Sequence, residues 1–365
     1  MLQLLRNWTD RYLSDPQIVI LGLVLSAGFL MMYMLGDMLT PVFIAVVIAY
    51  LLEGLVGLFA RIRLPRRVSV FVVFFIFIAC LLLVLIWLLP LLSRQIGQFI
   101  QDLPAMIAKG QKALMRLPET YPEFISRGQI DRFLIYLDSE LTSLGQRLLS
   151  LSLASVQGLI TMIVYLILVP LMVFFFLKDK ELILGWFEQH LPENRALVTR
   201  VWQEVNQQIS NYVRGKMWEI IIVWGVTWAA FSMLHLKYAM LLSFFTGLSV
   251  LIPYIGATLM TLPVALIAFF QWGPVSQFTY TLIAYGIIQA LDGNLLVPLL
   301  LSEVVNLHPV AIIVSLLVFG GLWGIWGLFF AIPLATLFHA VIKAWQVNQE
   351  ANHAPPAEET PTADG

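Results

Sequence analysis

Long apolar stretches recur along most of the chain, separated by short polar loops and by two longer polar segments. A helix needs about 20 apolar residues to span a bilayer. Stretches of this order predict membrane segments at 18–35, 38–60, 68–92, 153–177, 217–235, 239–270, 278–301 and 309–342. These runs are continuous and lack the alternation of membrane β-strands. We therefore predict an all-α polytopic membrane protein with about eight membrane segments.

The composition strengthens this prediction and narrows the class of function. The chain of 365 residues is 60% hydrophobic and 12% charged, whereas an average soluble domain is about 25% charged. The single cysteine, Cys80, lies inside an apolar stretch, which excludes an intrachain disulfide and a multi-cysteine metal site. The sequence has no basic stripe of the kind that would suggest a nucleic-acid partner. The tail at 346–365 has the composition of a disordered segment.

Basic residues predict the orientation, because short loops rich in Lys and Arg stay in the cytoplasm. The loop "ARIRLPRR" (60–67) is the strongest marker, and Arg6 and Arg11 agree with it. The first apolar stretch is long enough to stay in the membrane, so no cleaved signal peptide is predicted. The N-terminus, the 178–216 segment and the C-terminus are then cytoplasmic. A turn at 35–41 and the 93–150 region lie outside.

The two longer polar segments predict helices rather than loose loops. Apolar residues recur at helical spacing from Leu92 to Ile107. Prolines at 104, 118 and 122 would divide the 93–150 region into short amphipathic helices. These helices would pack on the membrane part or on a neighbouring subunit of a homo-oligomer. The predicted regions are an N-terminal three-span region (1–92), extracytoplasmic helices (93–150), a fourth span (151–177), a cytoplasmic helical linker (178–216), a transport bundle (217–345) and the tail (346–365).

Two apolar segments are too long for simple spans and carry helix-breaking residues in their centres. The 239–270 segment contains Pro253 and Gly256, and the 309–342 segment contains "GGLWGIWG". Each of these two segments is therefore predicted to form two half-helices. Re-entrant hairpins are favoured because each half-helix is too short to span the bilayer. Paired interrupted segments are a pointer to a transporter site. The alternative is that the glycines only permit close helix packing.

Asp292 lies inside the apolar run 278–301, where an ionisable residue is a functional hypothesis by default. Gln289 shares its helical face, three residues away. Gly293 and Asn294 can loosen the next turn. Such a patch of oxygens could hold a proton or Na⁺, or contact a polar solute. The alternative is a buried Asp292 that caps a neighbouring half-helix.

The remaining ionisable residues are weaker candidates. Glu53 is expected to be an interfacial acid, and Glu219, at a span edge, is expected to pair with Lys216. His308 precedes Pro309 and fits a helix start better than a pH sensor. His235 and His339 lie at segment ends and carry little weight.

The motifs of enzymes are missing from the sequence. The chain lacks HExxH and a Walker loop, and an aspartyl membrane protease would need a second membrane aspartate. We therefore predict that the protein is not an enzyme and needs no cofactor. A channel would be expected to place polar residues on several spans, whereas here they concentrate in one interrupted bundle.

Six motifs stand out along the chain: "FFFLKDK" (174–180), "NYVRGK" (211–216), "LIPYIGA" (251–257), "QALDGNLLVP" (289–298), "NLHP" (306–309) and "GGLWGIWGLFFAIP" (320–333). Their combination and order resemble the autoinducer-2 exporter family, and are closest to its PerM-type permeases. The resemblance extends from "LSDP" (13–16) to about Trp345. By this resemblance, the positions that correspond to the family motifs are Pro253, Tyr254, Gly256, Gln289, Asp292, Asn294, Pro298, His308 and Pro309.

The resemblance implies a multi-pass permease of the cell inner membrane, oligomeric, with transport carried by the C-terminal half. Family members are associated with export of the autoinducer-2 signal and with Na⁺/H⁺ exchange. We therefore predict a secondary transporter that exports a small polar solute, coupled to H⁺ or Na⁺. Its partners are the solute, the coupling ion, membrane lipids and further copies of the chain. The alternative is a channel-like or structural membrane protein without a solute cycle.

Overall fold

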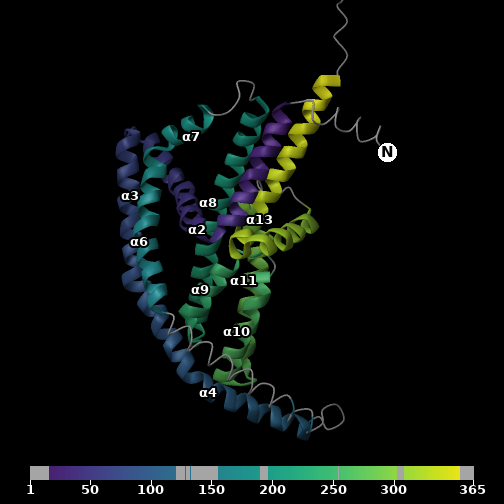
Figure 1. Cartoon of the computed structure of the whole chain (residues 1–365). Helices are drawn as coiled ribbons and strands as arrows, with labels where there is room; N and C mark the ends of the chain where they lie inside the picture. Colours follow the sequence, from purple (N-terminus) through teal and green to yellow (C-terminus); the bar gives the residue numbers. More distant parts are fainter. Residues whose placement is uncertain are drawn as a thin grey trace, which may run out of the picture. The chain divides into compact units, whose positions relative to one another are not determined.

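The computed structural model describes residues 16–120, 128, 132, 155–189, 196–253, 255–301 and 308–353, and every element among them is helical. Figure 1 labels most of them. The elements are α2 (Pro16–Arg61), α3 (Arg66–Leu83), the π-helix η1 (Val84–Leu88), α4 (Leu89–Thr120), α6 (Ser155–Lys178), α7 (Lys180–Gln189), α8 (Ala196–Met233), α9 (Ala239–Ser249), α10 (Ile255–Trp272), α11 (Ser276–Leu291), the π-helix η2 (Asp292–Leu296), α12 (Val297–Leu301) and α13 (Pro309–His353). The predicted all-α class is confirmed.

Six stretches among the described helices are long and apolar enough to cross a membrane. They are Met38–Arg61, Arg66–Lys112, Ile160–Lys178, Ile255–Trp272, Ser276–Leu301 and Pro309–Phe338. Large apolar side chains such as Phe75, Ile86 and Ile160 remain exposed, as expected of helices that face lipid. The predicted count of about eight is not confirmed, since α9 is short and 217–235 continues α8 without a break.

The turn predicted at 35–41 is wrong. Residues 35–41 are helical, and α2 continues through Pro41. The Thr40 hydroxyl donates a hydrogen bond to the Gly36 carbonyl (3.3 Å) in this turn. Apolar helices tolerate proline because hydroxyl side chains can satisfy backbone groups near the break.

The predicted division of the 93–150 region is also wrong where the structure describes it. α4 passes through Pro104 and Pro118 without interruption. Each proline removes one backbone donor, and the other residues of a continuous helix keep their hydrogen bonds. Pro122 and most of the region after it lie outside the described residues. α13 remains helical to His353, which lies within the predicted tail region.

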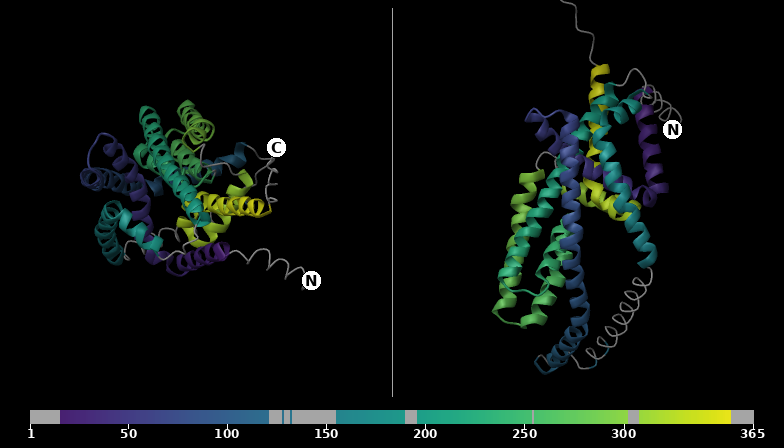
Figure 2. Two further views of the ribbon diagram at one scale, coloured as in Figure 1. Left: turned by 90° about the horizontal axis from the view of Figure 1, so that it is seen from above. Right: turned by 90° about the vertical axis from the view of Figure 1, so that its left-hand side faces the viewer.

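The described residues form two compact units. One draws on residues within 1–40, 180–214 and 301–365, and the other on 41–179 and 215–300. In the second unit, α10 and α11 lie side by side in each view (Figure 2). The six regions expected from the sequence are not tested by this division and stay predictions.

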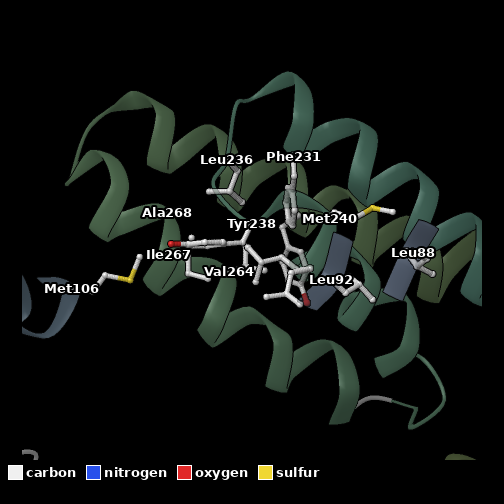
Figure 3. Packing of buried hydrophobic residues seen from close by; sticks show 13 residues of the cluster. Leu88, Leu92, Met106, Phe231, Leu236, Tyr238, Met240, Val264, Ile267 and Ala268 are labelled. Carbon is white, nitrogen blue, oxygen red and sulfur yellow. The ribbon is translucent and has the colours of Figure 1, made fainter. Parts of the chain in front are cut away.

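The second unit holds two apolar cores. The first lies where the C-terminal part of α2 packs with α3 and α6, around Val73 and Val173. The second joins α4, the end of α8, α9, α10 and α11 around Phe231, Val264 and Tyr285 (Figure 3). This second core fixes the positions of the helices that carry the candidate site.

α9 and α10 form a tight helical hairpin. The chain leaves α9 after Ser249 and enters α10 at Ile255. A Cβ atom at Gly256 would lie 1.8 Å from the Ser249 carbonyl oxygen, so only glycine permits this approach. The break predicted around Pro253 and Gly256 is confirmed.

α13 is likewise bent back on itself within "GGLWGIWG". Gly324 has φ 59° and ψ −132°, a conformation that interrupts the helix. A Cβ atom at Gly327 would lie 1.7 Å from the Phe319 carbonyl oxygen, so the two arms of α13 are in contact. The predicted break is confirmed, while re-entry of either hairpin from one membrane face stays a prediction.

Candidate functional site

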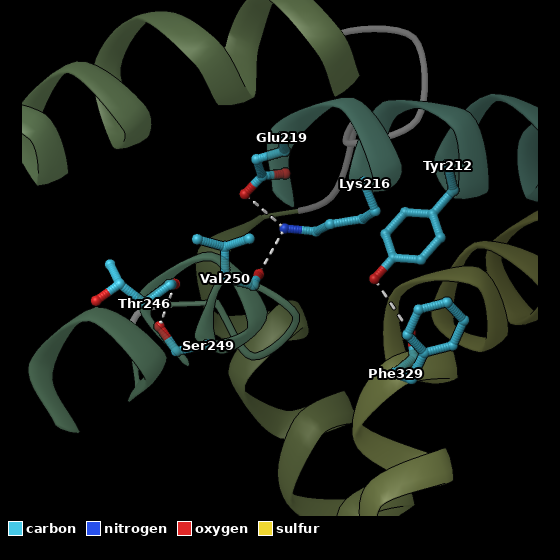
Figure 4. Close-up of polar contacts among 7 residues, drawn as sticks. All are labelled: Tyr212, Lys216, Glu219, Thr246, Ser249, Val250 and Phe329. Carbon is cyan, nitrogen blue, oxygen red and sulfur yellow. Dashed lines mark hydrogen bonds and ion pairs between the residues drawn. The ribbon is translucent and has the colours of Figure 1, made fainter. Parts of the chain in front are cut away.

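A buried ion pair on α8 faces the end of α9. The Lys216 ammonium lies 2.8 Å from Glu219 Oε1 and donates a second hydrogen bond of 2.8 Å to the Val250 carbonyl (Figure 4). Lys216 is 2% exposed and Glu219 is 1% exposed. The two side chains are three residues apart and therefore share one helical face. The predicted ion pair is confirmed, but it is buried.

The break between α9 and α10 explains why Lys216 reaches this position. The last carbonyls of a helix have no partner within it and carry the negative end of its dipole. α9 ends at Ser249, which leaves the Val250 carbonyl for the ammonium. The Ser249 hydroxyl donates to the Thr246 carbonyl (2.8 Å) and so satisfies a neighbouring acceptor. A lysine is therefore a favourable cap for α9.

Asp292 lies at the start of η2, where the helix after α11 widens into a π-helix. It is 8% exposed, and it interacts electrostatically with Lys216 and with Glu219. Its Oδ1 atom is buried and has no hydrogen-bond partner among the described residues, and the same holds for Glu219 Oε2. The Lys216 ammonium thus pairs directly with Glu219 and interacts electrostatically with Asp292, and each carboxylate has a buried oxygen without a hydrogen-bond partner among the described residues.

The structure brings Gln289 toward this part of the bundle and directs Asn294 elsewhere. Gln289 is half-buried, and its Nε2 atom is buried without a hydrogen-bond partner among the described residues, while the Tyr285 hydroxyl one turn earlier donates to the Ala257 carbonyl at 2.7 Å. Asn294 is exposed, and its amide donates to the Ala290 carbonyl (2.8 Å). The Asn294 amide thus satisfies a backbone carbonyl one turn earlier, and its contact with a solute or ion stays a prediction.

The other predicted positions serve the backbone. Pro253 accepts a hydrogen bond from Ile255 N (2.7 Å) in the α9–α10 turn, and Gly256 is buried beside α9. Tyr254 lies outside the described residues. His308 is exposed, and its Nδ1 accepts a hydrogen bond from Val310 N (3.3 Å). His308 is thus the helix-start residue that its place before α13 indicated.

Glu53 also behaves as expected from its position. It pairs with Arg66 at 3.1 Å, and Arg66 donates to the Leu177 carbonyl (3.4 Å). This contact ties α2, α3 and α6 together at the end of the first core. The position of Glu53 at the membrane interface stays a prediction.

A second polar site lies near the α8–α9 connection. The Tyr238 hydroxyl donates to Asp102 Oδ2 (2.6 Å), and the Lys237 ammonium lies 3.5 Å from the same oxygen. These three residues line a cavity of about 380 Å³ with Gln98 and Gln101. The contacts attach α4 to the start of α9, and sequence reasoning had not paired them.

Sequence reasoning also missed Lys216 as a site residue and gave Glu219 only a structural role. The signal that could have found them is their spacing of three residues in a chain segment with few charges. The Val250 carbonyl had no such signal, because every residue carries the same backbone acceptor.

Comparisons with known proteins agree on one transport family. The family model described as AI-2E family transporter matches residues 22–347. "Putative permease PerM" of Escherichia coli (strain K12) is 47% identical over 351 residues, covering 96% of this chain and 99% of that protein. "AI-2 transport protein TqsA" of the same strain is 24% identical over 346 residues, covering 91% and 95%. With the apolar helices, these matches indicate a multi-pass membrane transport protein rather than an enzyme. The resemblance found in the sequence is confirmed, and the chain belongs to the AI-2E transporter family.

Proposed function

We propose that this protein is a secondary transporter that exports a small polar solute and couples that movement to H⁺ or Na⁺. The observation that carries the proposal is Asp292, a buried acid with an unpartnered oxygen beside a buried ion pair. A buried charge is costly unless an opposite charge or a proton compensates it. A site that gains and loses one cation would therefore change its free energy strongly in each step of a transport cycle.

The local backbone supports a moving site. Asp292 begins a π-helix, and π-helices in α-helices are frequent at functional sites. We propose that the break of the neighbouring α9–α10 hairpin lies at membrane depth, where an interrupted backbone occurs if it is buried in protein or lines a cavity. We propose that the 217–345 region moves as the transport bundle and that both interrupted segments are re-entrant hairpins. The protein would lie in the cell inner membrane, with both termini cytoplasmic.

The solute is expected to be small and polar. The relative TqsA is named for transport of AI-2, so autoinducer-2 is the first solute to test with this chain. The alternative function is a channel-like or structural membrane protein without a solute cycle. We expect the exposed apolar side chains of α3 and α6 to contact membrane lipids. We also expect further copies of the chain to form a homo-oligomer with it.

The test is flux in proteoliposomes that contain the full-length protein. Asp292→Asn keeps the shape of the side chain and removes its charge change, so gradient-driven accumulation should be lost. Exchange of solute for solute needs no net ion movement and should survive, which controls for folding. Asp292→Ala should be worse because it also removes side-chain packing. Unchanged dependence of Asp292→Asn flux on pH and Na⁺ would make Asp292 a structural residue.

A further inference from the structure

We infer that Glu219 and Asp292 together hold one proton, and that Lys216 occupies the position that a metal cation would otherwise take. The inference rests on the proposed function and specifies the coupling ion of that site. It assigns Glu219 a role equal to that of Asp292.

Charge is concentrated at this point of the bundle. Residues 215–300 contain four charged side chains, Lys216, Glu219, Lys237 and Asp292. Lys237 pairs with Asp102 at the second polar site. Lys216 and Glu219 pair at 2.8 Å, and Asp292, which lies 73 positions after Glu219, interacts electrostatically with both. The fold therefore gathers every remaining charge of this segment into one buried cluster.

The cluster is one positive charge short of neutrality. Lys216 contributes one positive charge, while Glu219 and Asp292 contribute two negative charges when both are ionised. Each of the three side chains is more than nine-tenths buried. A net buried charge costs several kcal/mol. One proton on either carboxylate makes the cluster neutral, and loss of that proton to water makes it negative again.

The contacts favour a proton over a metal cation. A hard cation requires several oxygen ligands, and the Lys216 ammonium already sits 2.8 Å from both Glu219 Oε1 and the Val250 carbonyl oxygen. Within the cluster, this leaves Glu219 Oε2 and Asp292 Oδ1 as buried carboxylate oxygens without hydrogen-bond partners among the described residues. No group of three or more acidic, histidine or cysteine side chains that could hold a metal exists among the described residues. A proton needs only one of the two oxygens.

Neighbouring elements add no competing charged group. Among the described residues, α9, α10 and α12 contain no Asp, Glu, Lys, Arg or His. From α9, the Thr246 and Ser249 hydroxyls donate to backbone carbonyls. From α11, Tyr285 donates to the Ala257 carbonyl. The titration of the cluster therefore depends on its own three side chains.

The test counts protons on purified full-length protein in detergent. Infrared difference spectra over a pH titration report the C=O stretch of protonated carboxyl groups. The wild type should show one cluster carboxyl per chain that is protonated at low pH. Asp292→Asn and Glu219→Gln should each lose it, because one carboxylate then balances Lys216. Lys216→Met should gain a second protonated carboxyl. Asp102→Asn removes a carboxyl outside the cluster and should leave the cluster signal unchanged.

Competition with Na⁺ tests whether the cluster binds a proton or a sodium ion. At fixed pH, addition of NaCl in place of choline chloride should not displace the wild-type proton, whereas Lys216→Met should become sensitive to Na⁺. Displacement of the wild-type proton by Na⁺ would overturn the inference, and so would persistence of the signal in both carboxyl variants. If a variant fails to give a monodisperse protein, the wild-type Na⁺ titration still decides.

These measurements need no transport. A wild type that binds the proton but shows no coupled flux would remove the proposed function and leave the proton site. A wild type with coupled flux and a Na⁺-displaceable proton would keep the proposed function and remove this inference.

Discussion

Gly256→Ala should destabilise the protein through the α9–α10 hairpin. The added Cβ atom would lie 1.8 Å from the Ser249 carbonyl oxygen and 2.5 Å from the Ser249 carbonyl carbon. Neither atom belongs to a side chain that can rotate away, so the two helices must separate by more than about 1 Å. Overpacking of this kind costs roughly 1–3 kcal/mol.

Gly286→Ala on α11 is the matched control. It is exposed, and a Cβ atom there meets nothing within 4 Å. Alanine should stabilise the helix at this position by roughly 0.5–1 kcal/mol. The two variants should thus differ by about 1.5–4 kcal/mol, which for a chain of 365 residues corresponds to roughly 2–5 °C in Tm.

Thermal unfolding of the purified proteins in one detergent measures this difference. A second pair of variants, Gly327→Ala and Gly321→Ala, tests the other hairpin. A Cβ atom at Gly327 would lie 1.7 Å from the Phe319 carbonyl oxygen, whereas a Cβ atom at Gly321 meets nothing within 4 Å. Equal Tm values for Gly256→Ala and Gly286→Ala would refute the close approach of α9 and α10. Equal values for the second pair would refute the reversal in α13.

Three further predictions concern topology, assembly and the second polar site. In a cysteine-free background, Ser276→Cys should be labelled only from outside and Ser302→Cys only from the cytoplasm, and the reverse pattern would end the hairpin topology. Native mass spectrometry in mild detergent should detect a homo-oligomer that deletion of 100–145 weakens, whereas intact protein seen only as monomer would exclude it. Burial and the hydrogen bond to Asp102 raise the pKa of Tyr238 from 10.0 to about 12. The stability that Tyr238 contributes is therefore complete below pH 10 and lost as pH rises toward about 12. Tyr238→Phe should show a smaller drop in Tm over that interval, and an identical drop would contradict the contact.

The sequence predicted the helices well and their ends poorly. Continuous apolar runs identify buried or lipid-facing helices directly, and the breaks before Gly256 and at Gly324 were predicted from proline and glycine residues that weaken a helix. Proline was a weaker guide. It broke no helix at Pro41 or Pro104, because one lost hydrogen bond is small beside the packing of a long apolar helix.

The candidate site was predicted in part. Asp292 stood out as an acid in an apolar run, and its spacing to Gln289 was visible in the sequence. Its partners Lys216 and Glu219 were visible only as a local pair, since no pattern indicates that residues so far apart in the chain meet. Asn294 follows Asp292 by two residues, which places it on nearly the opposite side of the helix, where its amide donates to the Ala290 carbonyl.

The π-helix η2 has a consequence for comparing related chains. A π-helical turn holds one residue more than an α-helical turn, so the helix after Leu296 is displaced in phase from the helix before Asp292 by about 100°. A relative with a one-residue gap between these positions would have an unbroken helix there. Its aspartate could align perfectly with Asp292 and still sit on a different face relative to the residues that follow. In this family, a gap at 292–296 therefore carries more information about the site than the identity of the aligned acid.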